Sequence, residues 1–171
     1  MTAYVALLRA VNVGGTGKLP MAELKGMCTE IGFGNVRTYI ASGNVVFTSE
    51  LSEPEVKAAL EARLREYAGK PVGVMVRTSA EMAAVLAANP FPDAAGNRTV
   101  AIFLDTAPPA DALDAVRNQH DEVVRLGTRE IYVSYGAAMG TSKLAIPAAA
   151  KGTARNMNTV AKLTAMSTIA P

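Results

Sequence analysis

The residues with the clearest potential for chemistry form a glycine-rich loop near the start of the chain. The loop reads Asn12-Val13-Gly14-Gly15-Thr16-Gly17-Lys18, and it lies between an apolar run that ends at Arg9 and a segment that begins at Pro20. Glycines let backbone N–H groups approach an anion, and a helix N-terminus beside a lysine favours negative charge. We therefore expect a small anionic ligand, bearing phosphate or carboxylate, to bind here. The expected ligand-binding residues of the loop are Arg9, Asn12, Gly14, Gly15 and Lys18.

The loop differs from the phosphate-binding loop of nucleoside triphosphatases at both defining positions. That motif has a glycine five residues before the Gly-Lys pair and Ser or Thr after it, whereas Asn12 and Leu19 occupy these positions here. A second interpretation stays open, in which the loop only connects a strand to a helix and needs positive φ at Gly14 or Gly15.

A second polar group lies near the C-terminus. If residues 154–166 are helical, Arg155, Asn158 and Lys162 share one face at i, i+3 and i+7. Such a stripe can bind a carboxylate or phosphate, although most polar stripes are solvated helix faces. We expect Arg155 and Asn156 to complete the ligand site, provided that the C-terminus folds back toward the glycine loop.

Other residue types that could do chemistry offer weaker patterns. His120 lies in a polar passage where surface exposure is usual, and Cys28 lies on an apolar helix stripe, where an inert core thiol is expected. Ser142 and Lys143 are adjacent, so on a helix they point about 100° apart and cannot act as a nucleophile pair. No Cys/His or carboxylate group has metal-ligand spacing. We expect no metal and no cofactor.

Composition narrows the classes of partner. The 17 Lys and Arg residues exceed the 15 Asp and Glu residues by only two, and they are scattered, which is too little to indicate nucleic-acid binding from charge alone. We do not expect a nucleic-acid partner. A single cysteine excludes an internal disulfide. No apolar run approaches the roughly 20 residues of a membrane span, and Arg9 interrupts the first apolar stretch, which reads as a strand rather than a signal peptide. We expect a cytoplasmic protein without a membrane partner; its oligomeric state is open.

The first part of the chain predicts a familiar order of elements. Strands are expected at 3–9, 35–41, 44–49 and 72–77, with helices at 20–32 and from Ser52 to about Tyr67. Ser52 and Glu55 form a capping-box pattern, and Ser42-Gly43-Asn44 is a hairpin turn. The order βαββαβ is ferredoxin-like, with an antiparallel sheet and both helices on one face.

The second part predicts an incomplete repeat of that order. After a helix that Ser79 caps and a Pro/Gly/Asn-rich loop at 89–97, a strand is expected at 99–105, a helix near 109–118 and strands at 122–126 and 129–135. The fold class is therefore α+β: a ferredoxin-like subdomain at 1–78, a helix and connecting loop at 79–97, and a second α+β subdomain at 98–171. This second subdomain is an incomplete ferredoxin-like βαββ half with C-terminal helices, and we expect one compact body.

Several motifs make a family resemblance specific. They are Leu7–Gly15, Lys18–Leu24, Arg37–Phe47, Gly140–Leu144 and Thr153–Leu163. On these segments, and over nearly its whole length, the chain resembles the bacterial family catalogued as domain of unknown function 1697 (DUF1697). One departure is Met157, where that family usually has tryptophan. The resemblance implies a compact cytoplasmic α+β protein and carries over no reaction.

Three function classes remain open at this stage. The first is a small-molecule site, with or without catalysis, at the glycine loop. The second is nucleic-acid binding on a ferredoxin-like sheet, which needs exposed aromatic rings on the central strands, where this chain has only Tyr4 and Phe47. The third is a structural or protein-interaction role.

Overall fold

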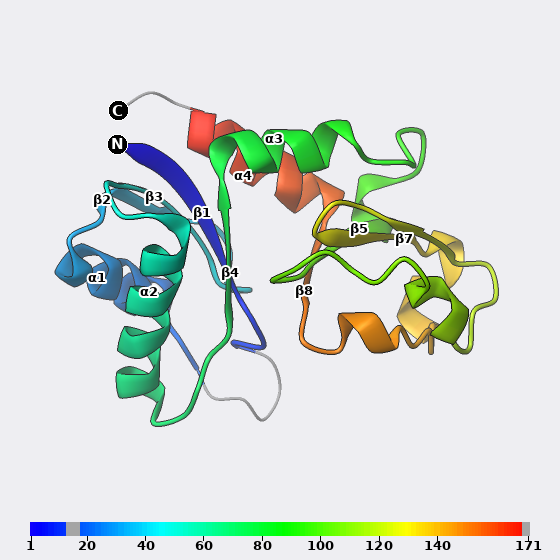
Figure 1. The fold of residues 1–171 in the computed structure, drawn as a ribbon, viewed down its shortest axis with the longest axis horizontal. Helices are drawn as coiled ribbons and strands as arrows, with labels where there is room; N and C mark the ends of the chain where they lie inside the picture. The colour runs from blue at the N-terminus through cyan, green and yellow to red at the C-terminus, as the bar shows by residue number, and fades with distance from the viewer. Residues whose placement is uncertain (13–17, 169–171) are drawn as a thin grey trace. The chain divides into compact units, whose positions relative to one another are not determined.

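The computed structural model describes residues 1–12 and 18–168, which form an α+β protein with two four-stranded antiparallel sheets (Figure 1). The chain divides into two compact units, with Met1–Ala83 and Leu163–Pro171 in unit 1 and Ala84–Lys162 in unit 2. The boundaries expected at residues 78 and 97, and the packing of both halves as one body, stay predictions. Of the expected ligand-binding residues, Gly14 and Gly15 lie outside the described residues.

Unit 1 contains the predicted order of strands and helices. Its sheet has the strand order β2-β3-β1-β4, and every neighbouring pair is antiparallel. The elements are β1 (Thr2–Leu8), α1 (Met21–Ile31), β2 (Gly34–Thr38), β3 (Asn44–Ser49), α2 (Glu53–Ala68), β4 (Val74–Thr78) and the start of α3 (Ser79–Ala87). The sequence thus predicted the existence and order of these elements correctly, with ends that differ by a few residues.

Local signals explain why α2 begins and ends where it does. The Ser52 N–H donates to Glu55 Oε1 (3.1 Å), and the Glu55 N–H donates to Ser52 Oγ (3.4 Å), which completes the capping box. At the other end, Gly69 adopts φ +72° and its N–H donates to the Arg65 carbonyl. These contacts fix the point at which the chain leaves α2 for β4.

Strand β1 lies in the middle of the unit 1 sheet, and both of its faces are buried. Tyr4, Ala6 and Leu8 belong to the cluster that includes the buried residues of α1 and α2, while Val5 and Leu7 alternate with them and are fully buried as well. The prediction of a strand covered on both faces is confirmed.

Unit 2 contains a second four-stranded sheet with the order β6-β7-β5-β8. Its strands are β5 (Thr99–Phe103), β6 (Val123–Leu126), β7 (Glu130–Ser134) and β8 (Thr153–Asn156). The short 3₁₀ turns are η1 (Gly96–Arg98) before β5, η2 (Ala112–Ala115) between β5 and β6, and η3 (Gly136–Thr141) and η4 (Pro147–Ala149) between β7 and β8. Helix α4 (Met157–Thr168) follows β8 directly.

Two predictions for this part of the chain were wrong. The helix expected near 109–118 is the single 3₁₀ turn η2, and the supposedly incomplete half has a fourth strand, β8. Strand β8 exists because it pairs with β5, from Val100 opposite Asn156 to Phe103 opposite Thr153. Gly152 permits that approach, since a Cβ there would lie 2.8 Å from Ile102 Cγ2. Four residues of this composition carry too little periodicity to reveal such a strand.

Within residues 1–12 and 18–168, no helix combines the length and the apolar character that crossing a bilayer requires.

Candidate functional site

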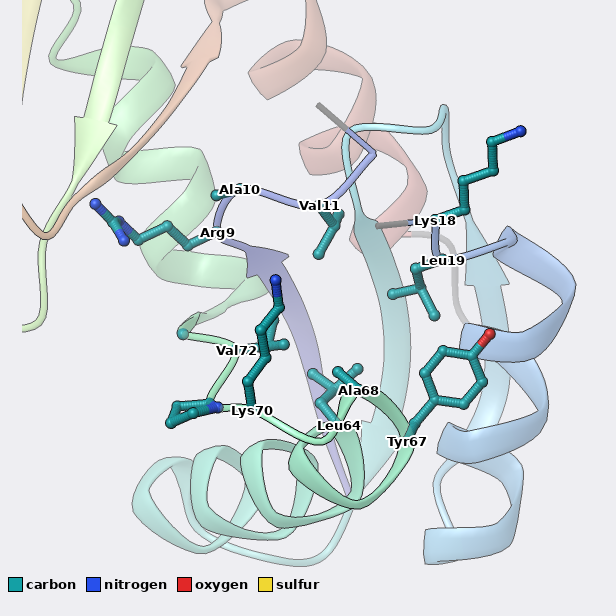
Figure 2. Close-up of a pocket in the computed structure, with 12 residues that line it drawn as sticks. Arg9, Ala10, Val11, Lys18, Leu19, Leu64, Tyr67, Ala68, Lys70 and Val72 are labelled. Atoms are coloured by element: carbon teal, nitrogen blue, oxygen red, sulfur yellow. The ribbon is translucent and has the colours of Figure 1, made fainter. Parts of the chain in front are cut away.

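A pocket of about 610 Å³ opens in unit 1 where β1 ends and β4 begins (Figure 2). We call it the β1–β4 pocket. Its lining comprises Arg9, Ala10, Val11, Lys18, Leu19, Leu64, Tyr67, Ala68, Lys70, Pro71, Val72 and Gly73. Its volume lies in the range of about 300–1,000 Å³ that is typical of small-molecule sites.

The sheet topology brings the two sides of this pocket together. Strand β1 pairs with β4 in antiparallel register, with Leu8 opposite Val74, so the residues after β1 lie beside those before β4. The Arg9 N–H donates to the Gly73 carbonyl at 2.9 Å and extends this contact past the strand ends. Segments 9–11 and 70–73 therefore form neighbouring walls, although some 60 residues separate them in the sequence.

Three cationic residues line the β1–β4 pocket. Arg9, Lys18 and Lys70 are all exposed. In Figure 2 the Lys70 side chain extends from its segment toward Ala10, while the Lys18 side chain points away from Leu64 and Ala68. The described lining contains no acidic residue. The charged residues of the described lining are therefore all cationic, and Figure 2 shows the Arg9 and Lys18 side chains pointing away from Leu64 and Ala68.

The interior of the pocket is apolar. Leu64, from α2, is 1% exposed and Leu19 is 5% exposed, and Val11 and Val72 contribute further aliphatic surface. Tyr67, in the last turn of α2, keeps 42% of its surface exposed. A ligand that enters this pocket thus meets apolar surface as well as positive charge.

Asn12 holds the ends of the glycine loop together. Its Oδ1 accepts the Leu19 N–H at 2.7 Å, and its Nδ2 donates to the Leu19 carbonyl at 2.8 Å and to the Ala41 carbonyl at 2.7 Å. Asn12 also adopts φ +56°, a conformation that asparagine tolerates better than most residues. Both of its N–H donors serve the protein itself, so the structure gives Asn12 a role in shaping the loop. Its contact with a ligand stays a prediction.

Arg155 lies on β8 in unit 2 rather than on a helix, which corrects the predicted polar stripe. Its guanidinium donates to Thr153 Oγ1 (2.8 Å) and to the Ala154 carbonyl (3.0 Å), and it is 7% exposed. Burial lowers the pKa of Arg155 to about 10. The neighbouring Asn156 accepts the Thr159 N–H through Oδ1 (2.9 Å) and caps the start of α4.

Arg155 and Asn156 belong to unit 2, whereas the residues that line the β1–β4 pocket belong to unit 1. Their participation in the ligand site stays a prediction. The helix stripe that motivated it was wrong, since Arg155 precedes α4 while Asn158 and Lys162 lie within it.

Among the lining residues that sequence reasoning missed are the aromatic Tyr67 and the cationic Lys70. Both lie near the C-terminal end of α2, about 50 residues after the glycine loop, and nothing local connects them to it. The signal that could have identified both residues is the topology of the sheet. In a βαββαβ sheet the first and fourth strands are neighbours, so the segment before the fourth strand must lie beside the segment that follows the first.

A smaller pocket of about 260 Å³ lies in unit 2, lined by Asn118, His120, Asp121, Glu122, Tyr135, Thr141, Ser142 and Lys143. Glu122 accepts the His120 backbone N–H at 2.6 Å and the Ser142 hydroxyl. These hydrogen bonds, with Ser142 first, lower the pKa of the Glu122 carboxyl. The Ser142 hydroxyl therefore donates to a carboxylate and is not paired with Lys143 as a nucleophile.

Metal binding and thiol chemistry find no support in the described residues. None of their His, Cys, Asp and Glu side chains gather in groups of three that could hold a metal ion. Cys28 is fully buried in α1, and burial raises the pKa of its thiol to about 12.

Comparisons with known proteins show a family for this chain and give no activity. The family model described as "Protein of unknown function (DUF1697)" matches residues 1–132. The solved structure of the conserved bacterial protein SP0830 from Streptococcus pneumoniae is similar over 99% of this chain and 99% of its own, with a TM-score of 0.83 and 26% sequence identity. No curated protein matches the chain.

Proposed function

The chain belongs to the DUF1697 family, and we propose that it binds a small anionic ligand, bearing phosphate or carboxylate, in the β1–β4 pocket. The observation that carries this proposal is that three cationic residues, Arg9, Lys18 and Lys70, line one pocket with an apolar interior, and that Lys70 extends toward Ala10 on the neighbouring wall (Figure 2). The proposal concerns binding and assigns no reaction.

The charges favour an anion for two physical reasons. Each charge-assisted hydrogen bond to a phosphate or carboxylate contributes about 1.5–3 kcal/mol, and the lower part of that range applies to exposed side chains such as these. In addition, a group of like charges raises the local concentration of a ligand of opposite charge. The glycine loop, with Gly14 and Gly15, is proposed to add backbone N–H donors to the ligand.

A ferredoxin-like fold is proposed for unit 1 on the basis of its strand order. The order β2-β3-β1-β4, the antiparallel pairs and the chain order βαββαβ support it. A cytoplasmic location is also proposed, with support from Cys28, which is a free and buried thiol.

Isothermal titration calorimetry with inorganic phosphate, sugar phosphates, nucleotides and carboxylates tests the binding proposal. We expect Lys70→Ala to weaken binding about tenfold, which corresponds to 1.4 kcal/mol. Arg9→Ala and Lys18→Ala should have smaller effects, because both side chains point away from the pocket interior (Figure 2). Lys25→Ala is the matched control, since Lys25 is an exposed lysine of α1 that does not line the pocket.

Two outcomes would overturn the proposal. If no anion binds, or if Lys70→Ala binds the anion as tightly as the Lys25→Ala control, the alternative of a structural or protein-interaction role is favoured. Nucleic-acid binding is a weaker alternative, because Tyr4 and Phe47 are 3% and 0% exposed and their rings pack against each other, with centroids 5.9 Å apart.

A further inference from the structure

We infer that the ligand of the β1–β4 pocket carries a planar aromatic ring in addition to its anionic group, with the ring against Tyr67 and the anion at Lys70. This inference rests on the proposed function and deepens it by naming the class of ligand: an aromatic phosphate or carboxylate of the size of a mononucleotide.

The first observation concerns Tyr67. It is one of the few large apolar side chains that are substantially exposed, at 42%, and it lines the pocket instead of lying on an outer helix face. Figure 2 shows its ring beside Leu19, at the opposite side of the pocket from Lys70. An aromatic face next to a buried aliphatic side chain is a favourable surface for stacking a second planar ring.

The second observation is that the pocket has two chemically different ends. Lys70 comes from segment 70–73, while Tyr67 and Leu19 lie across the pocket interior from it (Figure 2). Leu64 and Ala68 lie between the two ends. A ligand with only an anionic group would leave the Tyr67 end empty. A ligand with only a ring would make no contact of opposite charge with Lys70.

The third observation is size. A volume of about 610 Å³ exceeds what a lone phosphate or acetate would fill, and it suits a ligand with a ring, a spacer and an anionic group. Ligands that match the shape and polarity of both ends gain specificity from the contacts at each.

The experiment compares three probes that share one anionic group. Adenosine monophosphate carries ring and phosphate, ribose 5-phosphate carries the phosphate and sugar without the ring, and inorganic phosphate carries only the anion. We expect adenosine monophosphate to bind at least about tenfold more tightly than ribose 5-phosphate, the ratio that 1.4 kcal/mol of stacking corresponds to. Tyr67→Leu should abolish this difference, and Tyr67→Phe, which keeps the ring, should preserve it.

The variants separate this inference from the proposed function. Lys70→Ala should weaken binding of adenosine monophosphate and ribose 5-phosphate by similar factors, because both use the phosphate. If ribose 5-phosphate and adenosine monophosphate bind equally well, or if Tyr67→Leu weakens both equally, the ring site is overturned while anion binding stands. If none of the three probes binds, and no other anion of the calorimetric panel does, the proposed function itself fails.

Discussion

The side-chain amide of Asn12 forms two hydrogen bonds with the backbone of Leu19, seven residues later in the chain. Oδ1 accepts the Leu19 N–H at 2.7 Å, and Nδ2 donates to the Leu19 carbonyl at 2.8 Å. The second N–H of the same amide reaches the Ala41 carbonyl, in the turn between β2 and β3. One side chain therefore closes the glycine loop and ties it to the sheet.

Removing that side chain should destabilise the protein. We expect Asn12→Ala to lower the free energy of unfolding by about 1–3 kcal/mol, because two backbone groups of Leu19 and one of Ala41 lose their partner. Thermal and urea unfolding measure the change. Asn12→Gly, which relaxes the φ of +56° but also lacks the amide, should lose less than Asn12→Ala.

The control for the loop variant is Asn97→Ala, which removes an exposed asparagine in unit 2. It should change stability by less than about 0.5 kcal/mol. Equal stability of Asn12→Ala and Asn97→Ala would contradict the role of Asn12 in holding the loop.

Gly43 supports the same region by its lack of a side chain. It adopts φ +92°, and a Cβ there would lie 2.6 Å from Val11 Cγ2 and 2.9 Å from Leu8 Cβ. We expect Gly43→Ala to cost about 1–3 kcal/mol of unfolding free energy. Gly26→Ala in α1 is the contrasting control, because a Cβ at this position meets nothing within 4 Å. This substitution should stabilise the helix by about 0.5–1 kcal/mol. Chemical denaturation measures the free energy of unfolding of both variants. A change of the same sign in both would contradict the steric role of Gly43.

Cys28 should resist thiol reagents in the native protein. Its thiol is fully buried, and burial raises its pKa to about 12, so almost no thiolate forms near neutral pH. Labelling with a maleimide or disulfide reagent, with and without denaturant, measures this. Because the folded pKa exceeds the unfolded value near 9, the stability contributed by the neutral thiol is present below pH 9 and is lost as the pH rises toward 12. Fast labelling without denaturant would contradict the burial of the Cys28 thiol in α1.

Ser142 should control the titration of Glu122. The hydrogen bond from the Ser142 hydroxyl is the first cause of the lowered pKa of Glu122, so Ser142→Ala should raise that pKa. The lowered folded pKa contributes stability that is present above the unfolded value of 4.5 and is lost as the pH falls through the folded value. Carboxyl titration by NMR reports the change directly. Ser134→Ala, on β7, is a control that should leave the pKa of Glu122 unchanged.

Ligand affinity should depend on ionic strength. The exposed cations Arg9, Lys18 and Lys70 are screened by salt, and the Debye length shortens from about 10 Å at 0.1 M to about 3 Å at 1 M. Calorimetry with inorganic phosphate should therefore show affinity falling across this range. Affinity that is independent of salt would place the ligand away from these cations.

Local physical chemistry explains which parts of the fold the sequence determined by itself. The capping box of Ser52 and Glu55, the left-handed Gly69 and the apolar run of β1 act within a few residues of themselves, and each feature formed where its pattern predicted. The buried, unreactive environment of Cys28 follows from the apolar stripe of α1 in the same way. The family assignment also came from contiguous motifs.

Tertiary structure decided the remaining features, because they depend on partners that are distant in the chain. Strand β8 forms by pairing with β5, some 50 residues earlier, so Arg155 lies on a strand rather than on the predicted helix stripe. Lys70 and Tyr67 join Arg9 at one pocket because β1 pairs with β4. Asn12 became a structural residue because Leu19 and Ala41 approach its amide. The sequence determined which chemical groups this protein has, and the pairing of distant strands determined which of them meet, since a contact between distant segments depends on the folding of everything between them.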